Sequence, residues 1–119
     1  MNDIKIKSIF DQAEEYFTAA QEELFKPEED VVHYMVCKGA FKSIHGYLNW
    51  YLHLHEIKAS DSTSMAELTK HCRQLDDKFN KLNLDLLFNA HEEEDVWMNM
   101  ATAQEFMDLA LKTRELVKS

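Results

Sequence analysis

The sequence contains only two glycines and one proline in 119 residues, roughly a fifth of the share that an average chain carries. Sandwiches and barrels need turn residues roughly every 8 to 12 positions, and phosphate-binding loops need several glycines close together. The scarcity therefore excludes those β folds and the P-loop and Rossmann folds. A chain that is 45% hydrophobic can still fill a core, so a small all-helical domain is predicted.

Apolar residues in the first part of the chain alternate steps of three and four positions: Phe10, Ala13, Phe17, Ala20 and Leu24. This spacing predicts an amphipathic helix over residues 3 to 25. Its charged side includes the pair Glu14 and Glu15, which we expect to be solvated. Pro27 ends the helix, because proline lacks the amide hydrogen and clashes with the preceding turn.

A second helix is predicted from Pro27 to about Ile57, because proline suits a first turn and three acidic residues follow it. Two complete apolar stripes run along it, so we expect it to be central and to keep apolar surface for a dimer interface. Gly39 and Gly46 lie inside it, and each lowers the stability of the helix by about 1 kcal/mol relative to alanine. They share one side of the helix, which predicts the close approach of a neighbouring helix.

Two capping boxes, Ser64–Glu67 and Thr102–Glu105, mark the starts of a third helix and of the last one. Polar residues interrupt the apolar register between them, which predicts a break and a short helix near residues 78 to 89. The sequence thus predicts one all-α domain over residues 1 to 119, an up-and-down four-helix bundle with a short extra helix.

The second helix has one polar face, formed by Lys38, Lys42, His45 and Asn49 and continued by Leu52 and Glu56. We call the first four residues the polar ridge. Two cations, an imidazole and an amide on successive turns suit a phosphate or another acidic group. The polar ridge is therefore the candidate ligand-binding site, although a solvated strip or a contact with a second subunit would also explain it.

Six histidines raise the question of a metal site. Ferritin-like di-iron centres use Glu-x-x-His pairs, and only Asp30 with His33 has a carboxylate at that spacing. His91 and Asp95 are four residues apart and would share a helix face, so a metal-dependent enzyme at this pair is one alternative. No Gly-x-Ser-x-Gly elbow occurs. The sequence therefore assigns no catalytic residue, no metal site and no cofactor.

The chain carries 13 basic and 22 acidic residues, a net charge of −9. Nucleic-acid binding requires clustered lysine and arginine, so nucleic acid is not expected as the primary partner. There is no secretory signal pattern and no apolar stretch of membrane-spanning length, so no membrane contact is expected. Cys37 and Cys72 fall on apolar stripes, which predicts buried thiols in a reducing, cytoplasmic setting.

Four segments carry a family resemblance: residues 34–48 of the central helix, 64–72, 75–82, and 106–110 of the last helix. Their order and apolar positions resemble the HEPN family, the higher eukaryote and prokaryote nucleotide-binding domain. The resemblance implies an up-and-down bundle, often a homodimer and often the partner of a minimal nucleotidyltransferase in toxin–antitoxin or defence operons. Many HEPN members are ribonucleases that use an arginine and a histidine separated by four to six residues.

That ribonuclease motif is missing after Arg73, where lysine, phenylalanine and asparagine occupy the required positions. We therefore predict a non-catalytic HEPN-like binding or interaction module that forms a homodimer and partners a protein such as a nucleotidyltransferase. The alternatives are a nucleotide- or anion-binding module that uses the polar ridge, and a metal-dependent enzyme at His91 and Asp95.

Overall fold

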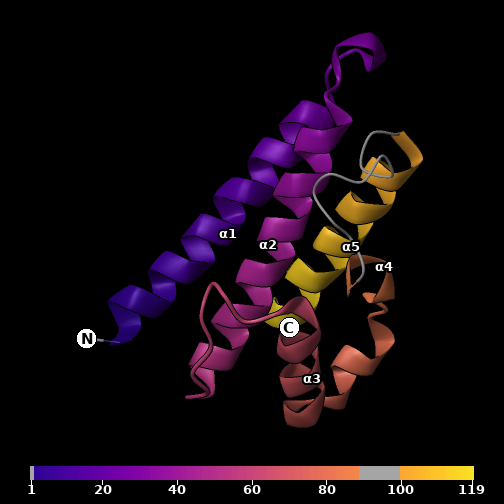
Figure 1. Cartoon of the computed structure of the whole chain (residues 1–119). Coiled ribbons are helices and arrows are strands. Elements are labelled where there is room, and N and C mark those ends of the chain that lie inside the picture. The colour runs from indigo at the N-terminus through magenta and orange to yellow at the C-terminus, as the bar shows by residue number, and fades with distance from the viewer. Residues whose placement is uncertain (1, 89–99) are drawn as a thin grey trace.

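A computed structural model describes residues 2–88 and 100–119, and within them every regular element is helical and no strand occurs. The α-helices are α1 (Asn2–Leu24), α2 (His33–Leu54), α3 (Met65–Leu75), α4 (Asp85–Phe88) and α5 (Met100–Lys118), and two 3-10 turns are η1 (Glu28–Asp30) and η2 (Asp77–Lys81) (Figure 1). The predicted all-α class is therefore confirmed. None of the helices in the described part of the chain is long and apolar enough to cross a bilayer.

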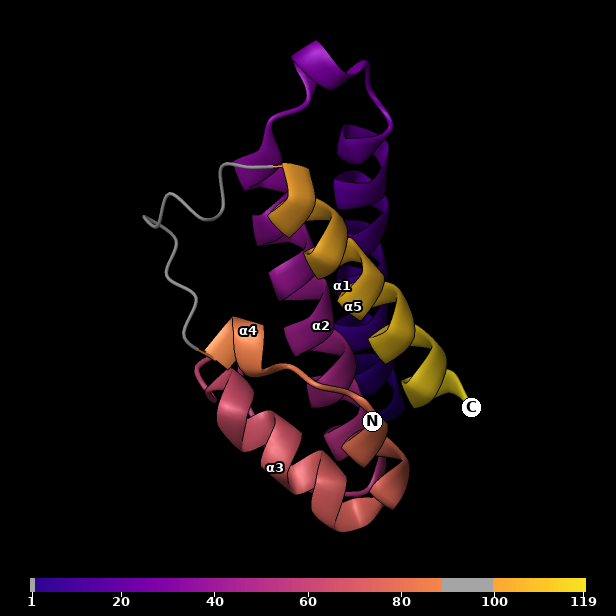
Figure 2. The same ribbon diagram turned by 90° about the vertical axis from the view of Figure 1, so that its right-hand side faces the viewer.

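Helix α2 lies at the centre, with α1 along one side, α5 along another and α3 against part of its length (Figures 1 and 2). Helices α1 and α2 are antiparallel, because Gly39 faces Ala20 and Gly46 faces Ala13. Helix α5 is also antiparallel to α1, because Arg114 lies over Phe17 whereas Lys118, nearer the end of α5, lies over Phe10, nearer the start of α1. Helix α5 therefore runs in the same direction as α2.

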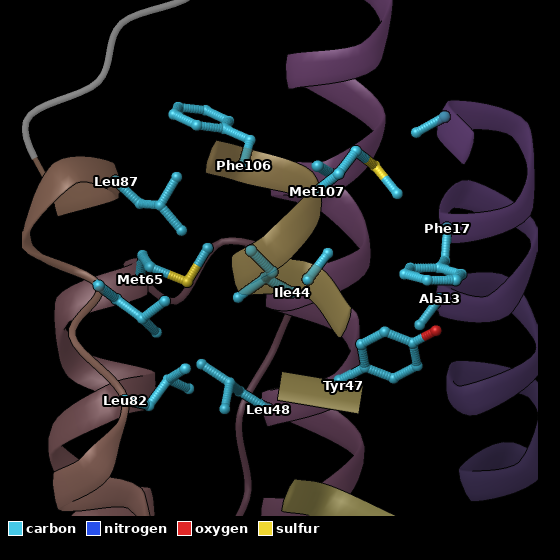
Figure 3. Close-up of a cluster of buried hydrophobic side chains, with 14 of the residues drawn as sticks. Ala13, Phe17, Ile44, Tyr47, Leu48, Met65, Leu82, Leu87, Phe106 and Met107 are labelled. Carbon is cyan, nitrogen blue, oxygen red and sulfur yellow. The ribbon is translucent and has the colours of Figure 1, made fainter. Parts of the chain in front are cut away.

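The core is assembled around α2 from side chains of every neighbouring helix (Figure 3). Figure 3 shows Ala13 and Phe17 of α1 on one side of the core and Met65, Leu82 and Leu87 on the other, with Phe106 and Met107 of α5 between them. Tyr47, Ile44 and Leu48 of α2 have no exposed surface. The broad apolar surface of α2 is thus largely covered within one chain, so it does not require a second subunit.

The start of α2 differs from the prediction, because Pro27 opens the 3-10 turn η1 and the α-helix begins only at His33. Val31 and Val32 are extended between them, and Val31 is buried in the core, with 9% of the residue exposed. The buried Glu23 carboxylate accepts the Val32 amide hydrogen at 2.9 Å. Burial of Val31 and this hydrogen bond favour a reversal of the chain over a continuous helix.

The end of α2 also differs, at Leu54 rather than Ile57. The Ile57 amide donates to the Leu52 carbonyl at 2.9 Å and the Glu56 amide to the His53 carbonyl at 3.1 Å. This pair of bonds is a Schellman motif, which places a left-handed residue after the helix. Glu56 holds that position with φ 62°, where glycine is the usual residue, so no glycine marked the end of the helix.

The other predicted boundaries were partly right. Ser64 caps α3 as expected, its hydroxyl accepting the Glu67 amide hydrogen at 3.1 Å. The predicted break after α3 is confirmed, but the segment forms η2 and the four-residue α4 rather than one short helix. The prediction for Thr102 was wrong: α5 is already helical at Met100, and Thr102 lies inside it as a buried residue.

Candidate functional site

A cleft of about 390 Å³ lies between α1 and α2. Helix α2 lines it with all four residues of the polar ridge and with Phe41 and Gly46, helix α1 with Ile9, Gln12, Ala13 and Tyr16, and the loop after α2 with Asp61. The structure therefore brings the predicted site residues together on one concave surface. Its volume falls at the low end of the range for small-molecule sites, about 300 to 1,000 Å³.

Helices α1 and α2 approach closely at two pairs of small residues, of which Gly46 and Ala13 line the cleft. A Cβ atom added to Gly46 would lie 2.8 Å from the Ala13 Cβ, and one added to Gly39 would lie 2.9 Å from the Ala20 Cβ. Carbon atoms normally stay about 3.5 to 4.0 Å apart, so these positions accept no side chain while the helices keep this distance. The predicted role of the glycines in close helix approach is confirmed.

The two lysines of the ridge provide positive charge at one end of the cleft. Lys42 is exposed, with its Nζ 5.3 Å from the Tyr16 ring centroid, and the half-buried Lys38 has its Nζ 5.8 Å from the Tyr34 ring centroid. Both distances permit cation–π attraction. Tyr16 lines the cleft, so its ring keeps the Lys42 ammonium group there, and Lys38 adds a second positive charge to the lining.

His45 fastens the loop that borders the cleft. Its Nε2 lies 2.7 Å from the Thr63 carbonyl oxygen, and because a carbonyl only accepts, Nε2 carries the hydrogen. His53 makes the same kind of bond to the Ala59 carbonyl at 2.9 Å. Two imidazoles of α2 thus fix residues 59–63, and this loop places Asp61 at the cleft. His45 therefore contributes to the cleft in two ways: its side chain lines the cleft, and its hydrogen bond to Thr63 positions the loop that carries Asp61.

Asn49 is the unusual member of the polar ridge. Only 3% of the residue is exposed, and its Oδ1 is fully buried without a hydrogen-bond partner among the described residues. An unpartnered buried carbonyl of this kind costs about 1 to 3 kcal/mol. Sequence periodicity placed Asn49 on a solvated face, so its burial and its unsatisfied oxygen could not be foreseen.

Leu52 and Glu14 also differ from the sequence interpretation. Leu52 was placed on the polar face of α2, as a contact for a second subunit, but it is fully buried in the core. Glu14 was expected to be solvated, yet its carboxylate accepts from Arg114 of α5 at 2.7 and 3.0 Å. The buried Tyr47 hydroxyl donates to the same carboxylate. These three residues link α1, α2 and α5.

Charge and burial shift the pKa values of Glu14 and Tyr47 in the cluster that these two residues form with Arg114. The hydrogen bond from Arg114 holds the pKa of Glu14 below its ordinary 4.5. Burial, helped by the neighbouring Glu14 carboxylate, raises the pKa of Tyr47 well above its ordinary 10. Tyr47 therefore stays protonated and Glu14 ionised at neutral pH, which is the state that maintains the cluster.

The remaining chemical candidates contribute no second site in the described part of the chain. No group of three or more histidine, cysteine or acidic side chains there could hold a metal ion. His91 and Asp95, the alternative metal pair, lie outside the described residues. Cys37 and Cys72 are free and buried, as predicted, and burial raises the pKa of each thiol to about 12.

The chain matches no family model, no curated protein and no solved structure. A functional assignment therefore depends on the geometry of the cleft and on the chemistry of the side chains that line it.

Proposed function

We propose that this chain is a non-catalytic binding module that holds a small anionic molecule in the cleft between α1 and α2. The observation that carries the proposal is the convergence of Lys38, Lys42 and the buried Asn49 on a single concave surface. The lysines supply positive charge in a chain whose net charge is −9. The two lysines outnumber Asp61, the acidic residue that lines the cleft. A local excess of positive charge on an acidic protein attracts anions at that position, which favours a defined ligand over nonspecific polyanion binding.

A nucleotide is the first ligand class to test. The resemblance to HEPN domains supports it, and so do the aromatic side chains Tyr16 and Phe41, which line the cleft beside the lysines. A phosphate would interact with the ammonium groups, and a planar base would pack on an aromatic surface.

Thermal unfolding in the presence of ligands tests this function. We would measure the midpoint with nucleotides, inorganic phosphate, short RNA and divalent ions, with and without a chelator. A ligand at 100 times its dissociation constant adds about 2.7 kcal/mol, enough to raise the midpoint by several degrees. The double variant Lys38→Ala/Lys42→Ala should lose the shift, while Lys70→Ala/Lys81→Ala, which removes two exposed lysines elsewhere, should keep it. Equal midpoint shifts in both double variants would reject the proposal that the ligand binds in the cleft.

Self-association is a second candidate, favoured by exposed apolar side chains where α1 and α2 are joined. Phe25, Met35 and Val32 are 76%, 54% and 46% exposed, and surface of this kind commonly marks an interface. We propose that a homodimer, or a protein partner such as a nucleotidyltransferase, covers this end in a reducing, cytoplasmic setting. Light scattering should give a dimer mass for the natural chain and a monomer mass for Phe25→Asp; a monomer in both cases would reject the homodimer.

A further inference from the structure

Building on the proposed function, we propose that the ligand of the cleft is zwitterionic: it carries a positively charged ammonium or guanidinium group as well as the anionic group that the lysines bind. The carboxylate of Asp61 binds the positive group. Asp61 is then a specificity residue, which distinguishes a zwitterion from a simple anion of the same size.

The first argument is that side chains of opposite charge line the cleft without pairing with one another. Lys38, Lys42 and Asp61 belong to the same lining, yet neither lysine forms an ion pair with Asp61 in the described structure. The lysine ammonium groups lie instead over the rings of Tyr34 and Tyr16. Because Lys42 and Asp61 are both exposed, a ligand with two opposite charges can reach a partner for each of them.

The second argument is that the loop carrying Asp61 is held in place beside α2. His45 bonds to the Thr63 carbonyl on one side of Asp61, and His53 bonds to the Ala59 carbonyl on the other. Hydrogen bonds among the loop's own serine and threonine groups close it into a turn. The Asp61 side chain takes part in none of these bonds, so its carboxylate stands on a fixed backbone without being used to shape the loop.

The third argument is the separation of the charges along α2. Because His45 is bonded to Thr63, two residues from Asp61, it marks the level of Asp61 along the helix. Lys42 precedes His45 by three residues and Lys38 precedes it by seven, which correspond to about 4.5 Å and about 10 Å at a rise of about 1.5 Å per residue. A single para-substituted benzene ring separates two charged groups by a distance within this range. Two aromatic side chains also line the cleft, which favours a ring between the charges.

Two aryl phosphates of nearly equal size test the proposal by calorimetry at low salt. 4-(Aminomethyl)phenyl phosphate carries an ammonium group across the ring from the phosphate, and 4-ethylphenyl phosphate carries a methyl group in its place. We expect the ammonium compound to bind the natural chain about fivefold more tightly, which is the upper end for an exposed ion pair. Asp61→Asn should remove this preference and should also tighten binding of the ethyl compound, because it removes a negative charge from the cleft.

A matched variant separates Asp61 from the general attraction of a cation to an acidic chain. Asp108→Asn removes the same charge from an exposed position on α5 outside the cleft, and it should retain the preference. Asp61→Asn should leave the unfolding midpoint unchanged, because the Asp61 side chain makes none of the bonds that fix the loop. A clearly lower midpoint would make Asp61 a structural residue and overturn the proposal.

The binding outcomes distinguish this inference from the function on which it rests. Equal affinity of the two phosphates for the natural chain, lost in Lys38→Ala/Lys42→Ala, would overturn the role of Asp61 and leave the anion-binding cleft intact. A preference that persists in Asp61→Asn would mean that another group attracts the ammonium, and would also overturn the inference. No binding of either phosphate at millimolar concentration would overturn both the inference and the proposed function.

Discussion

The close packing of α1 on α2 predicts that the two helices will not tolerate a methyl group at position 46. An added Cβ would lie 2.8 Å from the Ala13 Cβ, whereas the optimal carbon separation is about 3.5 to 4.0 Å. Overpacking of this kind typically costs about 1 to 3 kcal/mol. The higher helix propensity of alanine returns about 1 kcal/mol, so Gly46→Ala should lower the free energy of unfolding by about 1 kcal/mol.

A methyl swap tests whether that loss arises from the contact itself. Ala13→Gly alone should lower the free energy of unfolding by about 1 to 2 kcal/mol, through propensity and one lost buried methyl. The double variant Ala13→Gly/Gly46→Ala moves the methyl from one helix to the other and relieves the overlap. Its stability should return to within about 0.5 kcal/mol of the natural chain, although each single variant is destabilised.

Urea unfolding followed by far-ultraviolet circular dichroism gives the free energy of unfolding of the natural chain, the two single variants and the double variant. Ala19→Gly is the matched control, because Ala19 is exposed on the same helix and should show only the propensity cost of about 1 kcal/mol. If the double variant is as unstable as the two single losses added together, residues 13 and 46 are not in contact and the proposed helix approach is wrong.

Three further predictions concern the Glu14–Arg114 ion pair, the residue Glu56 at the end of α2, and the two buried cysteines. Because Arg114 lowers the folded pKa of Glu14, this ion pair stabilises the fold above about pH 4.5 and the contribution is lost as the pH falls through the folded value. Glu14→Gln should lose about 1 kcal/mol at neutral pH and give a flatter stability curve in acid titration; an equally steep curve would contradict this. Glu56→Gly should raise the free energy of unfolding by up to about 1 kcal/mol, because Glu56 occupies a left-handed conformation, while Glu56→Ala should change it little; thermal melts that rank alanine above glycine would contradict this. Cys37 and Cys72, with pKa values raised to about 12 by burial, should react with an alkylating reagent only as the protein unfolds, and rapid labelling of the native protein at mildly alkaline pH would show that they are accessible.

Patterns that depend on helical periodicity were predictable from the sequence. The apolar stripes of residues 3–25 and 27–57 gave the all-α class, and the two glycines gave the close approach of α1 and α2. These features follow from side chains three or four positions apart on one helix. The polar ridge was found in the same way, and its four residues do line one cleft.

Features that depend on contacts between distant segments were not predictable. Glu14 and Arg114 are 100 positions apart, so no local pattern connects them. Asn49 and Leu52 share the polar stripe of α2, but that end of the stripe is buried. Predictions from local residue preferences were also wrong where tertiary packing opposed them. Pro27 and the acidic residues after it favour a helix start, but Val31 is buried in an extended conformation and α2 begins at His33.

The most direct test of the cleft is an NMR titration of the ¹⁵N-labelled chain with 4-(aminomethyl)phenyl phosphate. The account predicts shifts concentrated on residues 9–16 of α1 and 38–49 of α2, with the Gly46 amide among them because Gly46 lines the cleft. The same titration of Lys38→Ala/Lys42→Ala should leave those amides unmoved. Shifts concentrated elsewhere, for example around Phe25, or no shifts at millimolar concentration, would contradict the proposal that this cleft is the functional site.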